Sequence, residues 1–208
     1  MKITNRKSDD IRIVKVMVDP IEQFNLWWSI AKLDSPLKLK NAICLSTIDG
    51  LGRPSARFVD LKKADNNGFI FCSYLTSNKG HEISNNPNVA LTAWWDHCGL
   101  QIRIAGIANL LPANENDKYW LTRARKAKIT TSLSQQSQVL NDEQTLIDQF
   151  HILEKKFHNK KVPRPKNWGG YQVKPLSIEF LTFKENRLHL REFFELKKTV
   201  WSRCLLQP

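Results

Sequence analysis

Several features that would assign a sequence to a class at once are scarce or missing from these 208 residues. No apolar run reaches the length of a membrane-spanning helix, and the first residues contain no apolar segment of the secretory type. The four cysteines form no CxxC pair and the five histidines are dispersed, so we expect no metal site. The GxGxxG, GxxxxGK[ST], GxSxG and HExxH motifs are also absent. These absences favour a cytoplasmic protein with reduced thiols and no membrane partner.

Positive charge is the feature present in excess. Lys and Arg number 32 against 20 Asp and Glu, which gives a formal net charge of +12 and a pI of about 9.7. This excess indicates an anionic partner, which is nucleic acid, an acidic membrane surface or a phosphorylated small molecule. The hydrophobic fraction of 41% is ordinary for a globular chain of this length, which buries its core without disulfide or metal.

The chain pattern predicts a mobile arm over residues 1–17, followed by a single domain over residues 18–208. Asp19-Pro20 opens a helix, in which Phe24, Trp27, Trp28 and Ala31 share one apolar face. Three further helices are expected over residues 79–85, 114–126 and 141–157, and a loop over residues 163–170.

Eight short strands are expected between these helices. The strands are residues 42–48, 55–62, 69–74, 89–95, 100–111, 176–183, 187–196 and 199–206. Links of about five or six residues between strands indicate antiparallel pairing, because parallel crossovers need a longer connection. The predicted fold class is α+β, built on an antiparallel barrel with flanking helices.

The sharpest local pattern is Arg187-Leu188-His189-Leu190-Arg191. In a strand, Arg187, His189 and Arg191 would share one face, and the two leucines would face a core. Three basic groups gathered on one face are suited to binding an anion. The alternative is a solvated edge strand with its polar residues turned outward.

A second pattern pairs Tyr119 with Arg123, four residues apart on one face of the predicted 114–126 helix. A phenol and a guanidinium together suit a phosphate or a carboxylate. The alternative is an aromatic ring packed on the barrel, with Arg123 in solvent.

Other polar residues are weaker candidates. Arg57 and Lys62 lie five apart on one strand, so they serve one site only through a bulge, a twist or a strand end. Lys79 lies near the start of a short helix, where the helix end already favours anions. Gln101, Gln136 and Ser137 are able to hydrogen-bond a heterocycle or a phosphate, or are ordinary surface residues.

From about Asp19 to Pro208 the chain resembles the pyridoxamine 5'-phosphate oxidase family of flavin enzymes. The matching blocks are Gly52-Arg53-Pro54-Ser55-Ala56-Arg57 with Leu61-Lys62, Ser77-Asn78-Lys79-Gly80, Asn86-Pro87, Gln136-Ser137, Pro163-Arg164-Pro165 with Trp168-Gly169-Gly170-Tyr171, Ile178-Glu179-Phe180, and Arg187-Leu188-His189. Their order and spacing extend over about nine-tenths of the chain.

The resemblance implies an FMN-binding split β-barrel that forms a homodimer with FMN at the subunit interface. It implies that FMN is held by Arg57, Lys62, Ser73, Lys79, Gln101, Gln136, Ser137 and Arg191. Substrate phosphate would be bound by Lys62, Tyr119 and Arg123, and the catalytic residues Arg187 and His189 would cover the substrate's pyridine ring. The family reaction moves a hydride from the substrate C4' carbon to flavin N5, and O2 then reoxidises the flavin to give H2O2.

Five positions depart from the family pattern. An aromatic residue is usual at Cys72, a basic residue at Asn78, a serine at Ala127, a tryptophan at Leu181 and an acid at Leu190. The changes at Asn78 and Leu181 are expected to weaken FMN binding, and Ala127 removes one donor from the substrate side.

Three functions follow from these observations. The first is an FMN-dependent oxidase that converts pyridoxamine or pyridoxine 5'-phosphate into pyridoxal 5'-phosphate. The second is a related FMN-dependent oxidase of another small aromatic metabolite, of the phenazine-biosynthesis type, and the third is a non-catalytic flavin- or nucleic-acid-binding barrel. The positions of the basic residues favour a small phosphorylated partner over nucleic acid and membrane.

Overall fold

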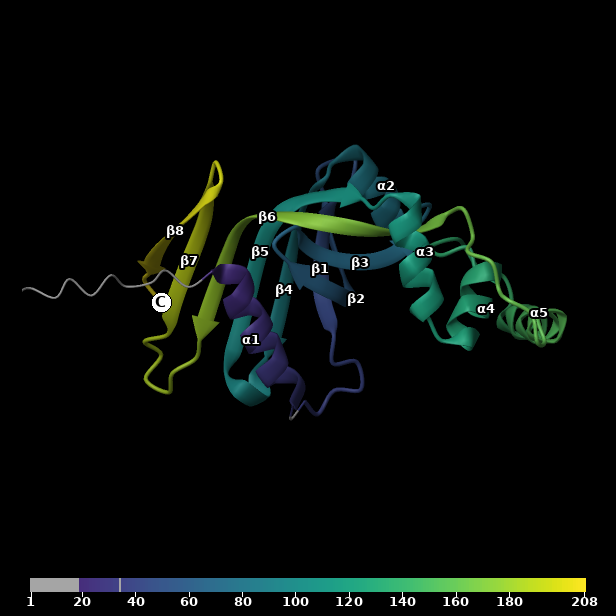
Figure 1. Cartoon of the computed structure of the whole chain (residues 1–208), viewed down its shortest axis with the longest axis horizontal. Helices are drawn as coiled ribbons and strands as arrows, with labels where there is room; N and C mark the ends of the chain where they lie inside the picture. Colours follow the sequence, from purple (N-terminus) through teal and green to yellow (C-terminus); the bar gives the residue numbers. More distant parts are fainter. Residues whose placement is uncertain (1–18, 34) are drawn as a thin grey trace, which may run out of the picture.

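The computed structural model describes residues 19–33 and 35–208, so the arm predicted over residues 1–17 lies outside the described residues (Figure 1). The helices are α1 (Pro20–Leu33), α2 (Asn78–Asn85), α3 (Ala113–Thr122), α4 (Arg125–Leu133) and α5 (Glu143–Lys156), with a short 3-10 turn at Asp96–Cys98. The strands are β1 (Ala42–Ile48), β2 (Pro54–Asp65), β3 (Gly68–Tyr74), β4 (Asn88–Trp95), β5 (Leu100–Leu110), β6 (Trp168–Thr182), β7 (Leu190–Lys197) and β8 (Val200–Leu206).

All eight strands form one antiparallel sheet that closes on itself. Its order is β3-β2-β1-β4-β5-β6-β7-β8, and an additional pairing of β3 with β6 closes the first six strands into a barrel. The last two strands extend beyond β6, at the opposite side of the molecule from α2, α3, α4 and α5 (Figure 1). The predicted α+β antiparallel barrel is therefore confirmed.

The core has two parts. The larger part fills the barrel, where Leu45, Phe71, Ile102 and Phe180 are essentially inaccessible to solvent. Helix α1 covers one end of this core through Phe24, whose ring centroid lies 4.8 Å from that of Phe69. Burial of such large apolar side chains is the main favourable contribution to the stability of the fold.

The smaller part of the core attaches α3 and α4 to the barrel. The indole rings of Trp120 and Trp168 meet edge to face at 5.0 Å, and Ile129 and Val162 pack with them. The indole N–H of Trp120 donates to the carbonyl oxygen of Val162 at 2.9 Å. This second cluster fixes the segment that contains Arg123 beside the start of β6.

Two predicted boundaries are wrong for identifiable reasons. The helix predicted over 114–126 is two helices, because Arg123 and Ala124 have extended ψ angles of about 143°. The predicted loop 163–170 ends earlier, since Trp168 already begins β6. Its glycines serve close packing and not a turn: a Cβ on Gly170 would lie 2.6 Å from the Leu111 side chain.

The third correction concerns the predicted strand 187–196. Strand β7 begins at Leu190, and Arg187 lies in the preceding turn with a φ of 65°. Asn186 stabilises that turn, because its side-chain oxygen accepts the N–H of Leu188 at 3.1 Å. Strand alternation therefore does not place Arg187, His189 and Arg191 on one face, and Leu188 is exposed and not in a core.

None of the helices in the described ranges is long and apolar enough to cross a membrane.

Candidate functional site

A polar cavity of about 560 Å³ lies between the barrel and the helices that flank it. Strands β2 and β3, the first turn of α2, and the segment around residues 123–137 supply its walls. Six of the residues singled out in the sequence line it: Arg57, Ser73, Lys79, Arg123, Gln136 and Ser137. This size is in the range of cavities that bind small ligands.

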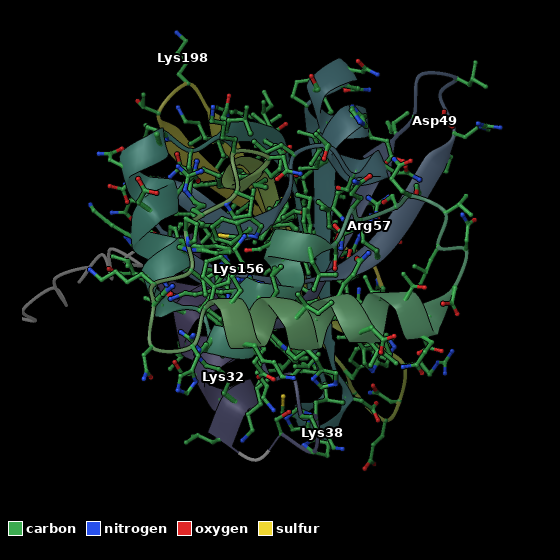
Figure 2. The ribbon with its side chains drawn as sticks, turned by 90° about the vertical axis from the view of Figure 1, so that its right-hand side faces the viewer. Lys32, Lys38, Asp49, Arg57, Lys156 and Lys198 are labelled. Atoms are coloured by element: carbon green, nitrogen blue, oxygen red, sulfur yellow. The ribbon has the colours of Figure 1, made fainter. Side chains whose placement is uncertain are left out.

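Arg57 is held at one side of the cavity by three neighbours. It forms an ion pair with Glu82 of α2 at 2.9 Å, donates to Ser55 at 2.6 Å, and also donates to the Thr47 hydroxyl. Arg57 is partly buried, and Figure 2 shows it within the outline of the molecule, whereas Asp49 lies on the projecting turn between β1 and β2. Its guanidinium is thus oriented before any ligand binds.

Lys79 lies at the N-terminus of α2 and is almost fully buried. Its ammonium donates to Gln136 Oε1 at 2.7 Å and to Ser77 Oγ at 3.3 Å. Burial lowers the pKa of Lys79 to about 8, the charge of Arg57 adds to this effect, and Glu82 opposes it. No carboxylate pairs with Lys79 among the described residues, so its charge is free for an anionic ligand.

The loop that follows α4 completes this side of the cavity. Gln136 accepts from Ser73 at 3.4 Å as well as from Lys79, and Ser137 Oγ accepts the backbone N–H of Asn78 at 3.2 Å. Ser137 has a φ of 76°, an uncommon conformation for a residue other than glycine. Such backbone strain is typical of functional sites.

Arg123 reaches the opposite wall. Its guanidinium carbon lies 5.0 Å from the ring centroid of Trp168, and one of its N–H groups donates to Thr131 at 3.0 Å. Its Nε is buried and has no hydrogen-bond partner in the described part of the chain. An unpaired buried donor is costly, so this atom fits a cavity whose ligand supplies the acceptor.

The predicted pairing of Tyr119 with Arg123 on one helix face stays a prediction. Helix α3 ends at Thr122, and Arg123 is its C-cap, with a φ of −70° and an extended ψ of 143°. Tyr119 is not among the residues that line the cavity, and burial raises its pKa. Arg123 reaches the cavity through the break between two helices.

Lys62 lies at a bulge in β2. Such an irregularity is required for Arg57 and Lys62, five residues apart on one strand, to serve one site. The β2–β3 register shifts between Leu61 and Lys63, so Lys62 is the extra residue that simple alternation does not place. Its ammonium pairs with Asp60, which lines the cavity.

Cys72 also lines the cavity. It is one of the positions that depart from the family pattern, in which an aromatic residue is usual. Burial raises the pKa of its thiol to about 11, although the charges of Lys62 and Arg123 oppose the change. The thiol therefore stays protonated near neutral pH, and Cys72 is not an activated nucleophile.

The remaining predicted residues form a second group at the other end of the sheet. Gln101, Leu181 and Arg191 are register partners across β5, β6 and β7, so their side chains share one face. Arg191 pairs with the buried carboxylate of Glu179 at 2.8 Å, and Arg103 pairs with the same carboxylate at 3.1 Å. This carboxylate holds the position of Arg191.

His189 and Arg187 belong to the turn between β6 and β7. His189 Nδ1 accepts the backbone N–H of Lys184 at 3.1 Å, and its ring packs against Phe183 at 4.9 Å. Arg187 is exposed. In Figure 1 this turn and helices α2 to α4 lie at opposite sides of the molecule, and none of the second group is among the residues that line the cavity.

Sequence reasoning did not single out two residues that hold Arg57. Thr47 is polar but occupies the third buried position of β1, after the inward-facing Ile43 and Leu45, and that mismatch was the available signal. Glu82 follows Lys79 by three residues on α2 and therefore lies near it on the helix surface.

The closed six-stranded barrel with its extra strands and flanking helices defines an α+β split-barrel protein, with a polar cavity beside the barrel that contains three cationic side chains. A family model described as pyridoxamine 5'-phosphate oxidase matches residues 30–157. A second one, described as the pyridoxine 5'-phosphate oxidase C-terminal dimerisation region, matches residues 168–208. The chain belongs to the pyridoxamine 5'-phosphate oxidase family.

Individual relatives agree with the family assignment. The chain is 40% identical over 190 residues to a protein of Leptospira biflexa, covering 91% of this chain and 89% of the relative. It is 41% identical over 192 residues to a protein of Anaplasma marginale, covering 91% and 88%. Both relatives carry the name pyridoxine/pyridoxamine 5'-phosphate oxidase.

Solved structures show the same fold. PhzG from Burkholderia lata 383, in complex with tetrahydrophenazine-1-carboxylic acid, superposes with a TM-score of 0.87 at 31% identity, covering 93% of this chain and 95% of that one. A pyridoxamine 5'-phosphate oxidase-related, FMN-binding protein from Nostoc punctiforme superposes with a TM-score of 0.75 at 14% identity, covering 92% and 100%. The second likeness supports the fold alone.

Proposed function

We propose that this chain is an FMN-dependent oxidase that converts pyridoxamine or pyridoxine 5'-phosphate into pyridoxal 5'-phosphate. The observation that carries the proposal is the cavity in which Lys79 has no carboxylate partner in the described ranges and Arg123 has a buried Nε without a hydrogen-bond partner there. These groups fit a phosphorylated ligand, because phosphate oxygens accept charge-assisted hydrogen bonds from such donors. Family membership and the relatives' names support the reaction.

Each group of residues has a distinct part in the proposal. Arg57, Ser73, Lys79, Gln136 and Ser137 would hold the FMN phosphate, with Gln101 and Arg191 against the ring. FMN, when bound, would supply the redox chemistry, which is hydride acceptance from the substrate C4' carbon with O2 as the final oxidant and H2O2 as the product. Lys62, Tyr119 and Arg123 would bind the substrate phosphate and thereby orient C4'. Arg187 and His189 would cover the pyridine ring.

The proposal includes a homodimer, because the chain holds the two residue groups apart. The cavity holds one group, and the β6–β7 end holds Gln101, Arg187, His189 and Arg191. A second copy of the chain would bring its β6–β7 end to the cavity of the first. The dimerisation-region match over residues 168–208 supports this arrangement, as do exposed aromatic side chains on the barrel such as Phe58, which is 74% exposed. We also propose that the protein is located in the cytoplasm.

The test is a visible absorption spectrum followed by an assay of peroxide release. Purified protein is expected to show the flavin spectrum and to release H2O2 with pyridoxine 5'-phosphate, but not with unphosphorylated pyridoxine, which Arg123 cannot anchor. Bound FMN without turnover of either 5'-phosphate would contradict the oxidase assignment.

A second function is supported by a specific likeness. PhzG from Burkholderia lata holds a phenazine-type acid and is 31% identical to this chain. In this chain, Cys72 and Asn78 line the cavity where the family pattern has an aromatic and a basic residue. Turnover of reduced tricyclic aromatic acids, with pyridoxine 5'-phosphate ignored, would favour this alternative.

A further inference from the structure

A second cavity, of about 650 Å³, lies outside the barrel and is strongly basic. The end of α3, the first turn of α4 and the segment after α5 enclose it. Six cationic side chains line it: Arg123, Arg125, Lys128, Lys160, Lys161 and Arg164. Asp117 is the one acidic residue among the lining residues in the described part of the chain, which leaves a large local excess of positive charge.

Cationic side chains of this basic cavity donate hydrogen bonds to backbone carbonyl oxygens. These bonds hold the side chains in place without neutralising their charge. Arg125 donates to the carbonyl oxygens of Phe157 and of Lys160, the latter at 3.0 Å. Lys128 donates to the carbonyl oxygen of Leu121 at 3.0 Å. Carbonyl acceptors satisfy the donors but carry no net charge, so the positive potential of the cavity persists.

The carboxylates nearby do not compensate this charge. Asp117 is occupied by Arg164 at 2.7 Å. Lys160 and Lys161 are exposed and form no ion pair with any carboxylate in the described ranges. The first turn of α4 adds to the potential, because its N-cap, Ala124, offers no side-chain acceptor to the free backbone N–H groups.

We propose that the basic cavity binds a small polyanion that carries two or more phosphoryl groups, such as pyrophosphate. A single phosphate carries about two negative charges at neutral pH, fewer than the cations gathered here. The cavity is also larger than one phosphate needs, and several separated cations suit several phosphoryl groups.

Arg123 links the basic cavity to the candidate active site, because it lines both. Its guanidinium lies over Trp168 and has an unpartnered Nε. A polyanion in the basic cavity would draw on the same cation and would repel a phosphate ester on the other side. The two ligands should therefore weaken each other's binding, and this step rests on the proposed function of the first cavity.

The first experiment measures pyrophosphate binding to the full chain by calorimetry at fixed ionic strength. The double variant K160E/K161E is expected to lose at least tenfold in affinity. A matched control is K38E/K198E, which makes the same change of charge at two exposed lysines at opposite ends of the view in Figure 2. Equal losses in both variants, or no binding to the wild-type chain, would overturn the site. If the glutamates unfold the protein, K160Q/K161Q serves in their place.

The second experiment measures the Kd of pyridoxine 5'-phosphate with and without saturating pyrophosphate. We expect a severalfold increase in the wild type and in K38E/K198E, and none in K160E/K161E. An increase that persists in K160E/K161E would mean competition within the first cavity and would overturn the coupling. Pyrophosphate binding is measured without turnover, so a chain that binds pyrophosphate but fails to oxidise the ester disproves the oxidase and leaves the basic cavity standing.

Discussion

At the scale of single residues, Lys79 is a cavity residue whose charge changes at mildly alkaline pH. It is buried, it bonds Gln136 and Ser77, and its pKa is lowered to about 8. It is therefore protonated at neutral pH but loses its charge at mildly alkaline pH. An anion that binds beside it gains most when the lysine is charged.

The resulting prediction concerns the pH dependence of FMN binding. Between pH 7 and 9 the affinity for FMN should fall, because Lys79 deprotonates through its pKa of about 8. The variant K79M should bind FMN about 10- to 100-fold more weakly at pH 7, the equivalent of about 1.5–3 kcal/mol for one charged hydrogen bond, and should lose this pH dependence. Fluorescence titration of FMN measures both effects. K63M is the control, since Lys63 is exposed and pairs with Asp65.

The same shift has a consequence for stability in the absence of ligand. The unfolded chain keeps Lys79 protonated up to its ordinary pKa of 10.5, whereas the folded chain releases the proton near 8. Between these two values the unfolded state binds more protons, so the contribution of this group to the free energy of unfolding rises with pH. FMN affinity and intrinsic stability therefore move in opposite directions in that window.

Arg57 and Arg187 are expected to separate cofactor binding from turnover. R57A should lower the FMN content of the purified protein more than the turnover per bound FMN, since Arg57 lines the cavity proposed for the FMN phosphate. R187A should do the reverse, because Arg187 lies in the exposed β6–β7 turn. Flavin absorbance per chain and peroxide release per flavin give the two quantities. Loss of FMN in R187A alone would reverse the assigned roles.

At the scale of elements, helix α2 must pack closely on the chain before it. A Cβ on Gly80 would lie 2.1 Å from the carbonyl oxygen of Leu75, a distance that no side chain tolerates without a shift of the helix. Since Lys79 is the neighbouring residue, any displacement of α2 also moves the ammonium that faces the cavity.

G80A is therefore expected to lower both stability and FMN affinity. Overpacking of this kind costs about 1–3 kcal/mol, and for a chain of this size each kcal/mol lowers Tm by about 2–4 °C. G50A is the control, because a Cβ at Gly50 meets nothing within 4 Å. Thermal unfolding followed by circular dichroism compares the two variants. A Tm for G80A equal to that of G50A would show that α2 adjusts freely.

The elements also show how far sequence patterns reach. Alternation and turn residues located all eight strands, and β1 agrees with its prediction at both ends. Sequence patterns predicted the wrong secondary structure where contacts between residues distant in sequence determine the backbone conformation. Gly169 and Gly170 signalled a loop, yet they lie in β6 opposite Ser73 and Cys72. The break at Arg123 carries no proline or glycine, so nothing local marked the end of α3.

The sequence predicted which residues line the candidate site better than it predicted how those residues are arranged in space. Arg57 and Lys79 belong to blocks that spacing or family resemblance singles out, and both line the cavity. The alternation argument for Arg187 and His189 failed, since a turn precedes β7. The basic cavity joins α3, α4 and the segment after α5, and no short-range pattern connects residues that far apart in sequence.

At the scale of the whole molecule, the excess charge of +12 divides unevenly. Arg57, Lys62 and Arg191, three of the basic residues assigned to the site, have carboxylate neighbours in Glu82, Asp60 and Glu179. Lys79 and Arg123 at the first cavity, and Lys160 and Lys161 in the basic cavity beside it, have no ion-pair partner in the described ranges. This distribution suits small phosphorylated ligands at defined places better than an extended polyanion.

The last prediction tests whether two chains complete one site. R57A damages the cavity group and R187A damages the β6–β7 group, so each variant alone should retain little activity. In a symmetric hybrid dimer, one site would carry both changes and the other neither; random exchange of subunits should therefore restore about a quarter of wild-type activity.

The control for this experiment mixes R57A with K79M. Both changes lie in the same group, so each site of their hybrid keeps one damaged cavity and no activity should return. Differently tagged chains, unfolded together and refolded, allow the hybrids to be counted while peroxide release is measured. Hybrids of R57A and R187A without recovered activity would mean that each chain holds a complete site. The two residue groups would then have to approach each other within one chain, which the described positions of α2 and the β6–β7 turn do not provide.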